Sequence, residues 1–281
     1  MSTVHYALFP RVRAVEFNAH AGAYVVGVPQ PTALAGFSHA VGLNLTRRFG
    51  LGLAQPPRIA YAVSEWSGLQ GKSPYPRSGF KTLSADAGVP ASIVDRVRAS
   101  CALSLLLELV VEEGETVPPA AQLSKIVEAS RIQGASLFIE QEPLFGEGLV
   151  ELAALLRKVP SDAFFLVDAR AVMAEKLQQQ PCTWQAMSDL ISRPTTAGVY
   201  KPRFVPALMG WRELSSAAAD SKAPKLAEPV LGLAQFITPG AFRKRAAAEE
   251  PVFWTHSTCP LPSVHHVVQC VSPSTFEIDF F

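Results

Sequence analysis

The sequence predicts an α+β fold, because strand-like and helix-like segments both occur but do not alternate regularly along the chain. Residues 5–14 fit a strand, because Arg11 and Arg13 alternate with Val12 and Ala14 at the two-residue period of a strand. Residues 34–49 carry apolar side chains at three- and four-residue steps, which is typical of an amphipathic helix. Residues 101–111 are almost entirely apolar, so their periodicity fits a central strand and a buried helix equally well.

Two positively charged side chains lie on the predicted first strand. The two-residue period puts Phe9, Arg11 and Arg13 on one face of this strand. The opposite face then carries Leu8, Val12 and Ala14. We interpret Arg11 and Arg13 as contacts to an RNA backbone, with structural ion pairs or partner contacts as the alternative.

A loop marked by glycine and proline connects this strand to the predicted helix. The loop contains Gly22, Gly27, Pro29 and Pro31, and Thr32 is the expected N-cap. The apolar stripe of the helix consists of Leu34, Phe37, Val41, Leu45 and Phe49. Gly50 is the expected stop, and His39 falls outside the stripe, about 140° from Leu34 at 100° per residue.

The rest of the chain is divided into elements of both kinds. Further strands are predicted over residues 58–66, 131–140, 163–167, 199–208 and 264–271. Helices are predicted over residues 120–130, 148–158, 169–179 and 183–192. Residues 227–236 are apolar, residues 215–225 look like a low-complexity linker, and no internal repeat is visible. We expect one elaborated domain over residues 1–281, although the length also permits two.

Residues 67–90 form a long segment rich in glycine, proline, serine and basic residues. Lys72, Arg77 and Lys81 are interleaved there with Tyr75 and Phe80. Cations bind phosphates and rings stack on bases, so this pattern favours a single-stranded nucleic acid. The alternative is an ordinary surface loop.

Charge is distributed unevenly along a chain whose net charge is only +1. Residues 1–100 carry a net charge of +6, whereas residues 108–151 carry −7. This asymmetry suits a subunit that contacts nucleic acid on one side and proteins on the other. Clustered, solvated faces would give the same numbers.

Composition excludes several classes of protein. With 48% apolar and 17% charged residues the chain is not intrinsically disordered, and four cysteines do not make a disulfide scaffold. There is no secretory signal and no apolar run long enough to cross a bilayer, so we expect a soluble cytoplasmic protein. Nucleotide-binding loops, a dinucleotide fingerprint and a nucleophile elbow are also absent from the sequence, which favours a protein without catalysis or cofactor.

Several further residues are candidates for RNA contact. They are Asn18, His39, Arg47, Arg203, Arg243 and Lys244. Each also has an ordinary explanation: Asn18 suits a loop that hydrogen-bonds its own backbone, and Arg47 suits the negative end of a helix dipole. His39 suits a local polar network, and the basic run 243–245 suits a solvated stretch of charged residues.

One group of residues points to a metal instead. His256, Cys259, His265 or His266, and Cys270 have ligand types that zinc prefers. Their spacing matches no zinc module that we can name, so buried cysteines and loop histidines are the favoured interpretation and no metal is expected.

The N-terminal motifs resemble those of a known family. Residues 8–41 (LFPRVRAVEFNAHAGAYVVGVPQPTALAGFSHAV) resemble the second Csy subunit, the Cas-five type, of type I-F CRISPR (Csy, or Cascade) surveillance complexes. The shared positions are Pro10, Arg11, Asn18, Ala19, Gly27, Pro29, Pro31, Gly36, Phe37, His39 and Ala40. Residues 98–110, 131–138, 156–179, 183–191, 200–214 and 228–244 resemble later segments of this family in the same order. Residues 246–281 match poorly.

This resemblance implies a modified ferredoxin-like core, of the RNA-recognition-motif or RAMP type, with a hairpin thumb at residues 67–90 and a partly helical insertion at 112–195. It implies a helix led by Glu228. It also implies a non-catalytic subunit that binds the 5′ handle of a crRNA and contacts the large subunit and the first backbone subunit in antiviral defence. Contact with target DNA near its protospacer-adjacent motif stays open.

Two other functions are consistent with the sequence. One is a RAMP-type endoribonuclease that processes repeat RNA, with His20 and His39 as the acid and base. The other is a zinc-stabilised protein-interaction module. The three hypotheses differ in whether the chain retains RNA, cleaves RNA or binds zinc.

Overall fold

The computed structural model describes residues 2–22, 25–70, 97–180, 182–191, 203–213, 227–257 and 264–270. Its fold is mixed α+β, as predicted, with a mostly antiparallel sheet. The strands are β1 Thr3–Asn18, β2 His20–Gly22, β3 Val25–Val26, β4 Arg58–Gln70, β5 Arg98–Val111, β6 Ser136–Ile139, β7 Leu144–Glu147, β8 Phe164–Asp168, β9 Arg203–Glu213, β10 Ala227–Ile237, β11 Phe253–Ser257 and β12 Val264–Cys270. The helices are α1 Pro31–Phe49, α2 Ala120–Ala129, α3 Gly148–Leu156, α4 Arg170–Gln179, α5 Thr183–Ile191 and α6 Pro239–Ala247. Among the described residues, no helix is long and apolar enough to cross a membrane.

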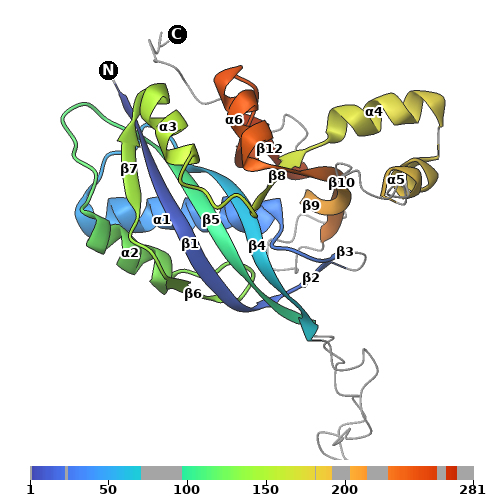
Figure 1. The fold of residues 1–281 in the computed structure, drawn as a ribbon, viewed down its shortest axis with the longest axis horizontal. Helices are drawn as coiled ribbons and strands as arrows, with labels where there is room; N and C mark the ends of the chain where they lie inside the picture. Colours follow the sequence, from blue (N-terminus) through green and yellow to red (C-terminus); the bar gives the residue numbers. More distant parts are fainter. Residues whose placement is uncertain are drawn as a thin grey trace, which may run out of the picture.

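One ten-stranded sheet organises the molecule (Figure 1). Its strand order is β11-β12-β9-β10-β8-β4-β5-β1-β6, and β7 also pairs with β1. A further pairing between Trp254 and Ile59 joins β11 to β4. The C-terminal hairpin β11–β12 therefore contacts both the β9 side of the sheet and its centre.

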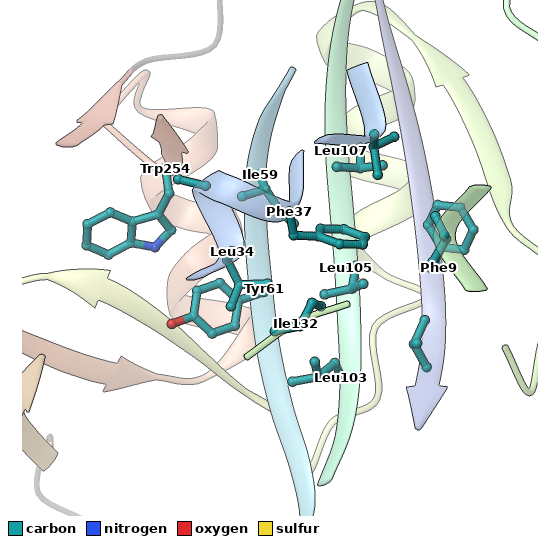
Figure 2. Packing of buried hydrophobic residues seen from close by; sticks show 14 of the residues in the cluster. Phe9, Leu34, Phe37, Ile59, Tyr61, Leu103, Leu105, Leu107, Ile132 and Trp254 are labelled. Atoms are coloured by element: carbon teal, nitrogen blue, oxygen red, sulfur yellow. The ribbon is translucent and has the colours of Figure 1, made fainter. Parts of the chain in front are cut away.

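Helices cover both faces of this sheet. Helices α1 and α2 pack on one face over the largest apolar cluster, whose members include Leu34, Leu105 and Ile132 (Figure 2). Helices α3 and α6 pack on the other face over a second cluster. Because side chains alternate along a strand, β5 contributes Leu105 to the first cluster and Leu106 to the second.

The apolar segment over residues 101–111 is a central strand, not a helix. It belongs to β5, which pairs with β1 on one side and with β4 on the other. Both faces of β5 are buried by helices, so no alternation of apolar and polar side chains remains in its sequence. The ambiguity in the sequence is thus explained by the position of the strand.

The order of the N-terminal strands along the chain differs from their order in the sheet. Along the chain the elements run β1, α1, β4, β5, α2 and β6, and in space the strands lie in the order β4-β5-β1-β6. Both helices lie on the same face. The order β1-helix-β4-β5 recurs as β8-helices-β9-β10, with spatial order β9-β10-β8, although no repeat is visible in the sequence.

The predicted faces of β1 are wrong for the two residues before Pro10. Phe9 is buried in the same cluster as Val12, not on the face of Arg11 and Arg13, and Leu8 packs in the second cluster, not with Val12. The register with β5 shifts between Phe9 and Val12, so the two-residue alternation is interrupted there. Pro10 lies in this bulge, as expected for a residue that has no N–H to donate to the ladder, and its carbonyl accepts a hydrogen bond from Ser104 Oγ at 2.7 Å.

Helix α1 matches its prediction, including the stop at Gly50, except at its N-cap and at Phe49. Gln30, not Thr32, is the N-cap, because Pro31 occupies the first helical position, where a missing N–H is harmless. The predicted stripe is buried apart from Phe49, which is 41% exposed. Gly50 ends the helix in the left-handed conformation, with φ 69°.

The later part of the chain departs further from the sequence analysis. Residues 144–147 and 253–257 form β7 and β11, which were not predicted. The helix that the resemblance implies from Glu228 is wrong, because residues 227–237 form β10. Residues 131–135 form a turn before β6, with positive φ at Gln133 and Gly134. The expected insertion at 112–195 contributes β6, β7 and β8 to the main sheet.

Candidate nucleic-acid interface

An exposed aromatic ring and a guanidinium group lie together on the β1–β6 edge of the sheet. Arg13 and Phe138 are directly opposite each other in the ladder between these strands. Phe138 is 48% exposed, and the guanidinium carbon of Arg13 lies 6.0 Å from its ring centroid. Sequence reasoning missed Phe138, although an exposed ring on a sheet is a typical platform for a nucleic-acid base.

An open pocket of about 470 Å³ lies next to this pair. It is lined by Val15, Glu16, Asn18, Arg98, Gln133, Gly134, Ser136 and Phe138. These residues come from β1, from the start of β5, from β6 and from the turn that precedes β6. The pocket therefore combines one ring, several amide or hydroxyl groups, and the guanidinium group of Arg98, which forms an ion pair with the Glu16 carboxylate. The ring, the amides and the hydroxyls are side chains suited to a nucleotide.

Two glutamates on the strands that flank β5 have left-handed backbone conformations. Glu16 on β1 has φ 58°, and Glu65 on β4 has φ 48°. Each lies where the register with β5 shifts, so both are bulge residues. Ser100 on β5 lies between the two bulges: its hydroxyl accepts a hydrogen bond from the Glu16 N–H, and its carbonyl accepts one from Ser67 Oγ. Left-handed non-glycine residues are strained and are common at functional sites.

The carboxylates near this edge pair with the arginines. Arg11 is bound by Glu65 and, at 2.6 Å, by Glu140, and these two hydrogen bonds raise its pKa further above its ordinary value. Arg13 Nε lies 3.2 Å from Glu140, and its side chain is 58% exposed. Arg11 thus forms the structural ion pairs named as its alternative role, while Arg13 is more accessible to a ligand.

Asn18 takes part in a chain of amide hydrogen bonds. Its side-chain oxygen accepts from the His20 N–H, and its carbonyl accepts from Gln133 Nε2 at 2.6 Å. Gln133 Oε1 accepts from the Gln30 N–H at 2.8 Å, and Gln30 Oε1 accepts from the Leu208 N–H at 2.8 Å. This chain fixes the loop before α1 against the β6 turn and β9. The feature of the sequence that could have indicated this turn is the glutamine–glycine pair at residues 133–134.

His39 lies away from the β1–β6 edge, on the exposed side of α1. Its ring makes an edge-to-face contact with the ring of His256 on β11, with centroids 6.2 Å apart. The pKa of His256 is lowered, first by burial and then by the nearby His39, so a neutral imidazole is favoured there. This ring contact is the interaction that the structure shows for His39, and both the RNA contact and the polar network considered for it stay predictions.

The two candidate zinc ligands whose side chains the structure describes, His256 and Cys270, lie on opposite faces of the sheet. On β11, His256 shares the face of Trp254, which packs in the α1 cluster, whereas Cys270 is opposite Phe253 and packs in the α3–α6 cluster. The Cys270 thiol instead bonds Arg58 and the Phe253 carbonyl. Cys259 and the side chains of His265 and His266 lie outside the described residues. Within the described ranges no group of three potential ligands occurs.

The other predicted RNA contacts are dispersed. Arg47 is exposed in the last turn of α1, whereas Arg243 and Lys244 lie on α6, which covers the opposite face of the sheet. Arg203 begins β9, but its side chain is outside the described part of the structure. The same holds for the whole of residues 71–96, which include Lys72, Arg77, Phe80 and Lys81. Of the predicted contacts whose side chains the structure describes, Arg11 and Arg13 share Glu140, and Asn18 lines the pocket next to the Arg13–Phe138 pair.

Comparison with protein-family models found no match, and no curated protein matched the sequence.

Proposed function

We propose that this chain is a non-catalytic RNA-binding subunit of a type I-F-like CRISPR surveillance complex, and that it holds the single-stranded 5′ handle of the crRNA. The observation that carries the proposal is the exposed Phe138–Arg13 pair beside the open pocket on β1 and β6. Its partners in the complex would be the large subunit and the first backbone subunit.

The order of the elements supports a modified ferredoxin-like core of the RNA-recognition-motif or RAMP type. Such a core has the chain order β-α-β-β-α-β, which β1, α1, β4, β5, α2 and β6 follow here with both helices on one face. RNA-recognition motifs stack bases on aromatic side chains of the sheet. Phe138 lies on β6 and faces the same side as Arg13, away from the α1 cluster.

The chemistry of the β1–β6 edge suits a single strand better than a duplex. A ring stacks on an unpaired base, while Arg13 and Arg98 reach phosphates and the side chains of Asn18 and Ser136 reach base edges or the ribose hydroxyl. No base-paired geometry is needed for these contacts. Residues 67–70 of the segment at 67–90 form the end of β4, where Gln70 pairs with Arg98. The rest of the segment lies outside the described residues, and its role as a thumb stays a prediction.

Replacing Phe138 by alanine should weaken binding of a labelled single-stranded RNA that carries the repeat-derived 5′ sequence. Stacking on one ring contributes about 1–3 kcal/mol per base, so affinity should fall by roughly tenfold to a hundredfold. Fluorescence anisotropy at fixed salt measures this change. Phe145→Ala is the matched control, because Phe145 is an exposed phenylalanine on the neighbouring edge strand β7 that is not opposite Arg13. Equal effects of both variants would argue against the site.

Replacing Glu140 by glutamine should have the opposite effect. Glu140 pairs with both Arg11 and Arg13, and its removal frees the guanidinium group of Arg13 for a phosphate, whereas Arg11 keeps its ion pair with Glu65. RNA affinity should rise by roughly threefold at low salt and the salt dependence should become steeper, because more counterions are released on binding. Thermal unfolding should change little, since exposed ion pairs stabilise by about 0–1 kcal/mol. An unchanged salt slope would show that Arg13 does not contact a phosphate.

Co-expression with a CRISPR array and the partner subunits tests the assembly itself. The purified complex should contain RNA of uniform length, and double charge reversal at Arg13 and Arg98 should release it. Isolation of the assembly without RNA would remove the proposal. Cleavage of repeat RNA that disappears in His39→Ala would support the endoribonuclease instead.

A further inference from the structure

Helices α3 and α6 form a groove on the sheet face opposite α1. Both helices pack on the second apolar cluster, through Leu152 and Leu156 of α3 and Phe242 of α6. Between their outer surfaces lies an open groove of about 650 Å³. None of the residues of the β1–β6 edge lines it, so the groove is separate from the RNA site.

Half of the described residues lining the groove have little or no side chain. Ala153 of α3 and Gly240, Ala241 and Ala247 of α6 line it. Val150 precedes Ala153 by three residues, on the same side of α3, and is 86% exposed. Small residues let the backbone of another helix approach closely, and an exposed valine next to them offers apolar surface for it to bury.

The rim of the groove is strongly basic. Arg157 at the end of α3 and Arg243 and Lys244 of α6 line it, and among the described lining residues there is no carboxylate. Helix α6 has no acidic residue. The single acidic residue of α3, Glu151, accepts a hydrogen bond from the Glu147 N–H. The cations along this groove therefore complement an acidic occupant.

We propose that the α3–α6 groove binds an amphipathic helix of a protein partner, with its small apolar residues on the groove floor and its acidic residues against Arg157 and Lys244. This is a helix-in-groove interface. A nucleic acid fits less well, because the lining residues include no ring for a base to stack on and no side-chain amide to read a base edge. The proposal goes beyond the RNA-binding function and does not depend on it.

The test uses the full chain and a synthetic helical peptide with glutamate on one face and alanine and leucine on the other. The peptide should bind with a Kd of roughly 10–100 µM by fluorescence anisotropy. Ala241→Trp fills the groove without changing charge and should weaken binding at least tenfold. Arg157→Glu combined with Lys244→Glu should do the same. Lys125→Glu on α2 is the matched control and should leave affinity unchanged, because Lys125 lies on the opposite side of the sheet.

Three outcomes would overturn the proposal. The first is equal binding of a proline-containing peptide of the same composition, which cannot form a helix. The second is peptide affinity that is lost on charge reversal but unchanged in Ala241→Trp, which would mean attraction without docking. The third is displacement of the peptide by oligouridine RNA in wild type and in Phe138→Ala alike, which would make the groove a phosphate site. Circular dichroism and thermal unfolding of each variant separate loss of binding from loss of fold.

Discussion

Replacing Glu108 by alanine is expected to lower the free energy of unfolding by about 3–5 kcal/mol, because it leaves a buried guanidinium group without its counter-ion. Glu108 on β5 is 1% exposed, and it lies opposite Arg58 of β4 in the ladder between the two strands. Arg58 Nε is 3.2 Å from Glu108 Oε1. A charge transferred from water to such a site is strongly disfavoured unless it is paired.

The pair also links the centre of the sheet to the C-terminal hairpin. Arg58 Nη1 donates to Cys270 Sγ at 3.1 Å, and the same sulfur lies 3.2 Å from the carbonyl oxygen of Phe253. Glu108→Ala should therefore loosen β11 and β12 as well as the β4–β5 ladder. Urea unfolding followed by circular dichroism measures the loss of stability. Hydrogen exchange of the β12 amides should report the loosening.

Two variants make this prediction specific. Arg58→Met combined with Glu108→Leu removes both charges, and it should recover most of the stability because apolar pairs often replace buried ion pairs at little cost. Glu175→Ala removes an exposed carboxylate on α4 and should change stability by less than about 0.5 kcal/mol. A loss below about 1 kcal/mol in Glu108→Ala would mean that water reaches Arg58 and replaces the carboxylate.

The pattern of consecutive residues predicted where helices and strands form better than it predicted which elements lie next to one another in the fold. The apolar stripe of α1 is a property of consecutive residues, so Leu34 and Phe37 identified the buried face correctly. The alternation in β1 failed at Pro10, because a bulge depends on the ladder with β5 and not on β1 alone. Strand β11 is five residues long and surrounded by irregular sequence, so its pairings with β4 and β12 were not visible beforehand.

Sequence reasoning was limited in the same way at the candidate RNA site, where it found residues but not their partners. Arg11 and Arg13 were identified because two charged side chains stand out in an otherwise apolar strand. The glutamates that pair with them, however, come from β4 and from the segment after β6. Phe138 was overlooked, since a phenylalanine in an apolar segment gives no sign of exposure until its strand is placed at the edge of the sheet. Burial and ion pairing depend on contacts between distant segments, which composition and spacing do not specify.

Replacing Trp254 by alanine is expected to destabilise the fold by about 3–5 kcal/mol, because a buried tryptophan leaves a large cavity. Trp254 is fully buried in the α1 cluster, and its Nε1 donates to the Leu166 carbonyl at 3.1 Å. It is also the residue through which β11 pairs with Ile59 of β4. Removal of the Trp254 ring should therefore separate the C-terminal hairpin from the centre of the sheet before the rest of the protein unfolds.

Trp254→Phe separates the packing of this ring from its hydrogen bond. Phenylalanine keeps most of the buried area but leaves the Leu166 carbonyl without its donor, so the loss should be about 1–3 kcal/mol. Trp211→Ala is the control, since Trp211 is 42% exposed on β9 and its removal should have a much smaller effect. Guanidinium unfolding gives all three values. If Trp254→Phe were as unstable as Trp254→Ala, the hydrogen bond, and not the volume of the ring, would attach the hairpin to β8. Burial alone would then not account for the position of β11.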